Sequence, residues 1–221
     1  STKEKTWRYR GDIYLNIASD PALLAKYPNA IQLSKESYFK NLELDKYGDY
    51  KVEVTGSLGR LQLLVSAMTD EHLKSDNYCG AADNFITISD ISARFAIVDS
   101  ASLFNAGLCY DKCGNNTKAL ENYKKCAELG YNTPDVYRYM SEVYLKDGKK
   151  EEARKVISDA RAKYPKDAEL LRTEVNIYLA DEQYERAENL LKSLTEADPK
   201  NEAIHYILGI TYGKLGKKDE E

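Results

Sequence analysis

The sequence predicts an all-α fold, a solenoid of antiparallel helix pairs, and three recurring spacings predict it. Tyrosines recur every 34 residues towards the C-terminal end, alanines recur at the same interval, and so do two prolines. A unit that recurs at such an interval cannot bury its apolar face alone, so successive units stack and share one core. The recurring residues are Tyr110, Tyr144, Tyr178 and Tyr212, then Ala119, Ala153 and Ala187, and finally Pro165 and Pro199.

Residues 1–99 carry irregular copies of this unit. A first helix contains Trp7, and its partner is expected at 30–44. The segment 18–29 exceeds the repeat length, so it is predicted to be an insertion. Insertions in repeat proteins map to loops. A long helix is expected over about 50–75, followed by a partner helix that contains Phe85.

Residues 100–221 carry the regular copies. In the clearest copy, the small Ala153 lets two helices approach closely, Gly148 suits the left-handed end of a helix, and Pro165 stops the second helix. We expect five helix pairs and a terminal helix in one continuous solenoid. The regular units are 100–133, 134–167, 168–201 and a truncated 202–221.

Composition excludes several classes of protein. The 221 residues include 32 basic and 36 acidic ones, giving a formal net charge of -4. The two signs alternate along the predicted helices, which is typical of a solvated surface and not of a nucleic-acid-binding stripe. The longest apolar stretch, Leu61–Met68, is too short to span a membrane.

The four cysteines do not follow a metal-binding pattern. Cys109 and Cys113 are four residues apart and could in principle share a metal with Cys126, but structural zinc sites use two close pairs. Cys109 and Cys126 fall where the repeat takes small apolar residues, and free cysteine packs as one. We therefore predict buried thiols at these two positions, and no metal or cofactor.

Catalytic chemistry is not predicted. Both histidines, His72 and His205, occupy positions that the repeat fills with large packed residues. The glycine-lysine segment 213–218 lacks the length and the closing hydroxyl residue of a phosphate loop. The sequence therefore favours a binding protein over an enzyme.

These spacings resemble the tetratricopeptide repeat family, strongly over 100–221 and partially over 1–92. The resemblance implies a right-handed superhelix whose concave groove, lined by the first helix of each pair, binds a protein or peptide segment without catalysis. The layout, irregular repeats before regular ones, is also similar to bacterial proteins of the family, many of them exported. It favours a periplasmic or cell-envelope location over the cytoplasm, although four cysteines without a framework fit a cytosolic protein.

The resemblance also implies which side chains line the groove. The guanidinium groups of Arg138 and Arg172, beside aromatic rings, would hold an acidic segment or a C-terminal carboxylate. Alternatively, Arg138 pairs with Glu142 four residues later, as helix-surface ions often do. The family's carboxylate clamp is not expected, because Ile207 stands where the clamp needs an asparagine. The candidates are Phe104, Arg138, Tyr139, Glu142, Arg172, Asn176 and Tyr206.

Two functions remain open on the sequence. The first is a scaffold that binds a protein or peptide segment in the groove. The second is a structural module that packs through open solenoid ends, near Trp7 and beyond Tyr212, within a larger protein or a homo-oligomer.

Overall fold

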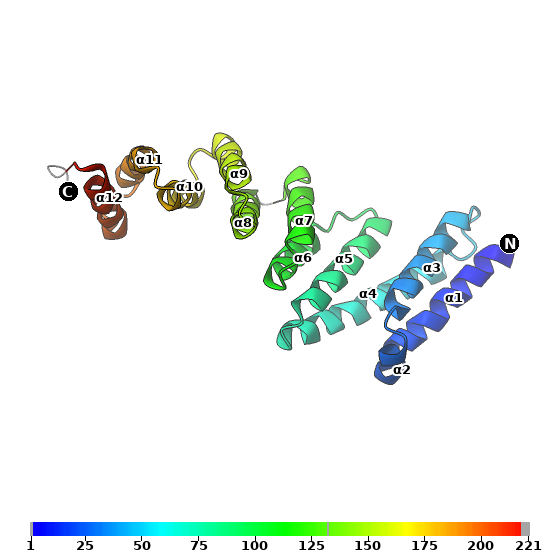
Figure 1. The fold of residues 1–221 in the computed structure, drawn as a ribbon. Coiled ribbons are helices and arrows are strands. Elements are labelled where there is room, and N and C mark those ends of the chain that lie inside the picture. Colours follow the sequence, from blue (N-terminus) through cyan, green and yellow to red (C-terminus); the bar gives the residue numbers. More distant parts are fainter. Residues whose placement is uncertain (1, 132, 218–221) are drawn as a thin grey trace. The chain divides into compact units, whose positions relative to one another are not determined.

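The computed structural model describes residues 2–131 and 133–217, which form helices joined by turns and contain no strand (Figure 1). The predicted all-α fold of successive helix pairs is confirmed. The helices are α1 (Thr2–Ser19), α2 (Pro21–Lys26), α3 (Ala30–Leu44), α4 (Lys51–Lys74), α5 (Tyr78–Arg94), α6 (Ser100–Lys112), α7 (Asn116–Glu128), α8 (Thr133–Lys146), α9 (Lys150–Lys163), α10 (Ala168–Ala180), α11 (Tyr184–Ala197) and α12 (Glu202–Leu215).

The chain forms two compact units, residues 1–122 and residues 123–221. In the first unit, α1 packs along α3, and α4 packs along α5 (Figure 1). Within the segment predicted as an insertion, Asp20 accepts hydrogen bonds from the backbone N–H groups of Ala22 and Leu23 and so begins the short α2. The core of this unit contains Leu15, Tyr38, Val54, Leu58, Leu61, Val65, Ile88 and Ile91.

A disulfide joins two helices of the first unit. Cys79, at the start of α5, bonds to Cys113, directly after α6, with Cα atoms 5.6 Å apart. The sequence analysis did not predict this bond. The other two cysteines, Cys109 and Cys126, are free and buried, as predicted.

In the second unit, α8 pairs with α9 and α10 pairs with α11, while α12 packs on α11. Gly148 has a φ of +73°, the left-handed conformation expected for the turn after α8. The turn after α10 has no glycine, and Glu182 takes the left-handed conformation there with a φ of 57°. One apolar cluster of this unit contains Leu171, Val175, Leu191, Leu194, Ile204, Leu208 and Tyr212.

The described residues contain neither a membrane-spanning helix nor a cluster of metal-ligating side chains. None of the described helices combines the length and the apolar character that a membrane crossing requires. The described side chains of histidine, cysteine, aspartate and glutamate also form no group of three that could hold a metal ion.

Candidate functional site

The seven predicted groove residues lie in both units. Phe104 is a partly buried residue of α6, in the first unit. The other six lie in the second unit, on the first helices of its pairs and on α12. They are Arg138, Tyr139 and Glu142 on α8, Arg172 and Asn176 on α10, and Tyr206 on α12.

Arg138 already has carboxylate partners on its own helix. Its guanidinium donates to Asp135 Oδ1 at 3.0 Å and to Glu142 Oε1 at 3.0 Å. The same group lies 4.5 Å from the ring centroid of Tyr139, and that ring stacks on Tyr123 with centroids 5.9 Å apart. Burial lowers the pKa of Arg138, but its bond to Asp135 and the charge of Glu142 outweigh burial and raise it, so the group stays charged. The ion pair considered as an alternative to groove binding is therefore present.

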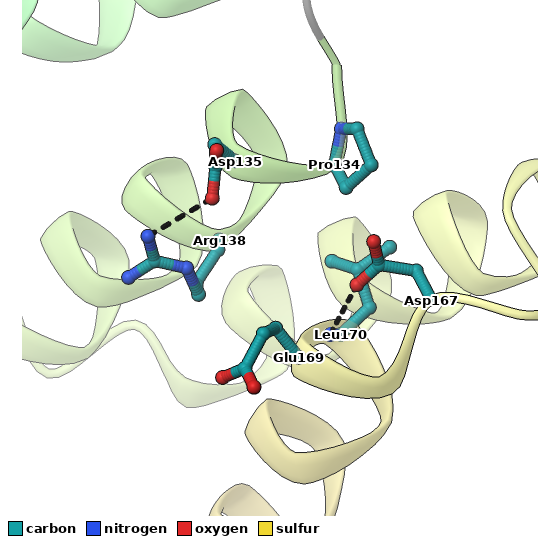
Figure 2. A pocket seen from close by; sticks show the side chains of 6 residues that line it. All are labelled: Pro134, Asp135, Arg138, Asp167, Glu169 and Leu170. Atoms are coloured by element: carbon teal, nitrogen blue, oxygen red, sulfur yellow. Dashed lines mark hydrogen bonds and ion pairs between the residues drawn. The ribbon is translucent and has the colours of Figure 1, made fainter.

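A hollow of ≈ 300 Å³ lies between the starts of α8 and α10, and Figure 2 shows its side chains. Three of its lining residues are carboxylates and one is a guanidinium. Asp135 is paired with Arg138, and Asp167 accepts from the backbone N–H of Leu170 at 2.8 Å, capping α10. The acidic excess favours a neutral or basic group in this hollow. Its lining is Pro134, Asp135, Arg138, Asp167, Glu169 and Leu170.

A second hollow, of ≈ 310 Å³, lies between α10 and α12 and differs in chemistry. Arg172 and Asn176 line it, and their side chains are accessible. Arg172 Nη1 lies 2.7 Å from Glu169 Oε1, in a pair whose side chains are 42% and 63% exposed. The remaining wall is largely apolar, so this hollow combines one guanidinium and amide groups with an aliphatic floor. Its other lining residues are Val175, Leu191, Leu194, Asn201, Ala203, Ile204 and Ile207.

The structure adds residues that sequence reasoning missed. Ala203 and Ile204 were not singled out, and Ile207 served only as evidence against the carboxylate clamp, yet all three line the second hollow. The signal was the apolar character of α12 on the side that faces α10. Tyr206, by contrast, lines neither hollow and is 71% exposed on α12.

Comparison with known proteins supplies the family. The family model described as tetratricopeptide repeat matches residues 100–129, which span α6 and α7. Residues 100–129 therefore match a tetratricopeptide repeat, and the rest of the chain is similar to that family in fold. Proteins with these repeats are scaffolds for protein–protein interaction rather than catalysts, and this chain has their fold. No curated protein matches the chain.

Solved structures of tetratricopeptide repeat proteins share this fold. A crystal structure of MamA protein aligns with a TM-score of 0.58 at 17% identity, covering 73% of this chain and 86% of that one. MamA from Desulfovibrio magneticus RS-1 aligns with a TM-score of 0.54 at 20% identity, covering 72% of this chain and 86% of that one. A tetratricopeptide repeat protein from Parabacteroides merdae aligns with a TM-score of 0.50 at 10% identity, covering 98% of this chain and 75% of that one. At these identities the likeness concerns the fold alone.

Proposed function

We propose that the chain is an interaction scaffold that binds a segment of another protein across α10 and α12. The segment places an aliphatic side chain in the hollow between these helices and a carboxylate, either acidic or C-terminal, against Arg172 and Asn176. The observation that supports this is the lining of the hollow, where a guanidinium and an amide border an aliphatic floor. Such a combination suits a ligand with one apolar and one anionic group.

Arg172 is able to exchange its present partner for a ligand. Its ion pair with Glu169 is largely exposed, and exposed pairs of this kind contribute only about 0.2–1 kcal/mol. A bound carboxylate that also buries apolar surface competes effectively with such a pair, because guanidinium–carboxylate bonds strengthen where water is excluded. Asn176 adds an exposed amide donor one helical turn further along α10.

The residues on α8 have a supporting role in this proposal. Arg138 is flanked by two carboxylates and its side chain is only 26% exposed, so it is less available to an anion than Arg172. Its stacking with Tyr139 instead gives the groove a rigid aromatic border. Tyr206 offers a further exposed ring on α12, and Phe104 stays a candidate on the first unit.

The proposal is tested with peptides displayed with free carboxyl termini and selected for binding to the full chain. A selected peptide is then measured by titration calorimetry with a free and with an amidated C-terminus. Arg172→Ala is expected to weaken binding at least about tenfold, because a hydrogen bond to a charged group contributes about 1.5–3 kcal/mol. Glu169→Gln is expected to strengthen it by releasing Arg172. Lys155→Ala, at an exposed position of α9, serves as the control that leaves affinity unchanged.

Two results would contradict this site. Selected peptides that bind Arg172→Ala as tightly as the unaltered chain would show that the hollow is not used. Binding weakened by Glu169→Gln would show that the groove takes a basic segment, as the acidic hollow beside α8 favours.

A second candidate is assembly through the ends of the solenoid, into a homo-oligomer or onto further repeats. It is favoured by exposed apolar side chains on α1 and α12, where Ile13 is 58% and Ile210 is 48% exposed. Light scattering over a dilution series separates the candidates, since a species that stays monomeric at high concentration argues against homo-assembly.

A further inference from the structure

The first unit carries an uncovered face on α1 that the proposed groove does not involve. Residues of α1 and Tyr27, the residue that follows α2, line a hollow of ≈ 660 Å³. Arg10 is the one charged residue among those that line the hollow. We call this surface the α1 face, and its residues are Thr6, Tyr9, Arg10, Ile13, Tyr14, Ile17 and Tyr27.

The repeat register shows what the α1 face corresponds to in the second unit. Tyr14 of α1 takes the position of the repeat that Tyr178 takes in α10, and Arg8 then takes the position of Arg172, so the two helices can be aligned without a gap. Four residues of the α1 face then match three residues of α10 and the residue that directly follows it: Thr6 with Leu170, Arg10 with Glu174, Ile13 with Ile177, and Ile17 with Asp181.

All four of these residues, in α10 or directly after it, contact the preceding helix, α9. Leu170 and Ile177 cluster with apolar residues of α9. Glu174 Oε2 lies 3.3 Å from Arg161 Nε, and Asp181 pairs with Lys150 and with Arg154 at 2.6 Å. This side of the first helix of a pair is therefore where a preceding helix packs.

The first unit shows the same arrangement at α6, which packs on α5. The matching residues there are Ser102, Ala106, Cys109 and Cys113, of which Cys113 is bonded to Cys79 of α5. One position gives the contrast directly. Ile177 is 3% exposed and Cys109 is 5% exposed, whereas Ile13 is 58% exposed. Among these helices, α1 has a helix-packing face that the described residues leave uncovered.

Charge indicates what kind of helix fits the α1 face. Glu174 of α10 faces an arginine of α9, whereas the matching residue of α1 is Arg10. A helix that binds the α1 face would therefore need a carboxylate opposite Arg10. Arg10 donates to Ser37 Oγ at 2.5 Å and lies 5.0 Å from the ring centroid of Tyr14, which fixes its guanidinium in place. In the described part of the chain it pairs with no carboxylate.

We propose that the α1 face binds an amphipathic α-helix of a partner protein, with an aliphatic ridge against Ile13 and Ile17 and a carboxylate against Arg10. A second copy of the α1 face is a poorer occupant, because it would supply another Arg10 and no carboxylate among its lining residues. Two packed helices contact each other through side chains three and four residues apart on each helix. The spacing of Arg10, Ile13 and Ile17 matches this pattern.

The test uses a peptide built on α9, the helix that covers the equivalent face of α10. The probe is the sequence of residues 150–163 with Arg161→Glu, held helical by a staple on its outer side, because free peptides of this length are only marginally helical. It is titrated into the isotopically labelled full chain and followed by two-dimensional NMR. Chemical shifts are expected to change at the backbone amides of Thr6, Arg10, Ile13 and Ile17, with up to about fivefold weaker binding when the peptide retains Arg161.

Variants of the chain sharpen the test. Arg10→Glu is expected to reverse the preference between the two peptides, which a general loss of structure would not do. Ile13→Asp is expected to abolish binding. Leu63→Asp is the matched control, since Leu63 is a 73% exposed leucine of α4 outside the α1 face, and it is expected to bind normally.

Three outcomes would overturn the proposal. The first is the absence of shift changes at the α1 face with both peptides. The second is equal binding of both peptides, which would remove the role of Arg10. The third is a concentration-dependent change at the same amides without peptide, which would identify a second copy of the chain as the occupant.

Discussion

At the scale of single residues, Gly11 determines how closely α1 approaches α3. A Cβ atom at Gly11 would lie 2.5–2.9 Å from three ring carbons of Tyr38. That ring is fully buried, and its hydroxyl donates to Asp12 Oδ1 at 2.8 Å, so it has no room to move aside. Burial and the bond to Asp12 also raise the pKa of Tyr38, which keeps the hydroxyl protonated as the donor.

We expect Gly11→Ala to destabilise the first unit by about 1–3 kcal/mol, the usual cost of overpacking a core. Urea unfolding measures the change. Gly59→Ala is the matched control, because a Cβ at Gly59 meets no atom within 4 Å, and alanine there should stabilise α4 by about 0.5–1 kcal/mol. Equal effects of the two substitutions would show that the contact with Tyr38 does not limit the packing.

Residue-level predictions succeeded where the repeat itself dictates packing. The buried positions of Cys109 and Cys126 followed from the repeat, because those positions admit only small apolar side chains. The Cys79–Cys113 bond was missed, although its separation of 34 residues equals the repeat interval. Whether two cysteines can form a disulfide depends on the position of α5 relative to α6. The pattern of small and large residues in the repeat does not specify that position.

The site was predicted in part for the same reason. The repeat indicated which side chains of α8, α10 and α12 to consider. It left open which partners Arg138 and Arg172 take, because a carboxylate three or four residues away competes with any ligand. In the structure both arginines have such partners, and the apolar floor beside Arg172 distinguishes the two hollows.

At the scale of helices, the disulfide holds α5 and α6 together at one end. It closes a loop between residues that are 34 apart, and a crosslink over that length removes unfolded-state entropy equivalent to about 4 kcal/mol. Reduction is therefore expected to destabilise the first unit by up to about that amount, measured by urea unfolding with and without dithiothreitol.

The double variant Cys79→Ser with Cys113→Ser provides the control for reduction. It should match the reduced chain in stability and show no further response to dithiothreitol. The buried thiols should not substitute for the missing bond, because burial raises the pKa of Cys109 and raises that of Cys126 to about 11, so both stay protonated. A variant as stable as the oxidised chain would show that the bond contributes nothing.

Helix boundaries show where sequence patterns are informative. The range expected for the partner of the first helix, 30–44, coincides with α3, although most of the buried residues of α3 are polar and its apolar pattern is interrupted at 34–37. The short α2 was not anticipated. It has six residues and none of them is buried, so apolar periodicity cannot reveal it, and its start depends on the local cap by Asp20.

At the scale of the whole molecule, the chain forms two units, each of which contains an apolar cluster, and one continuous solenoid stays a prediction. Each unit contains a feature whose loss can be measured without altering the other. In the first unit it is the contact of Gly11 with Tyr38. In the second it is Glu188, a 4% exposed carboxylate of α11 that lies 2.7 Å from Lys192 Nζ and 2.7 Å from Lys217 Nζ.

Glu188 gives the second unit a dependence on pH. Its hydrogen bonds to Lys192 and Lys217 lower its pKa in the folded state below the ordinary value for glutamate. Its stabilising contribution is therefore complete above the unfolded pKa of about 4.3 and is lost as the pH falls through the lower folded value. Glu188→Gln should accordingly cost stability at neutral pH, and the difference from the unaltered chain should shrink below about pH 4.

When Glu188→Gln is combined with Gly11→Ala at neutral pH, the two losses in unfolding free energy should add to within about 0.5 kcal/mol, because the residues share no partner. Urea unfolding of the four chains measures this, and a larger departure from additivity would show that the two sites are energetically coupled.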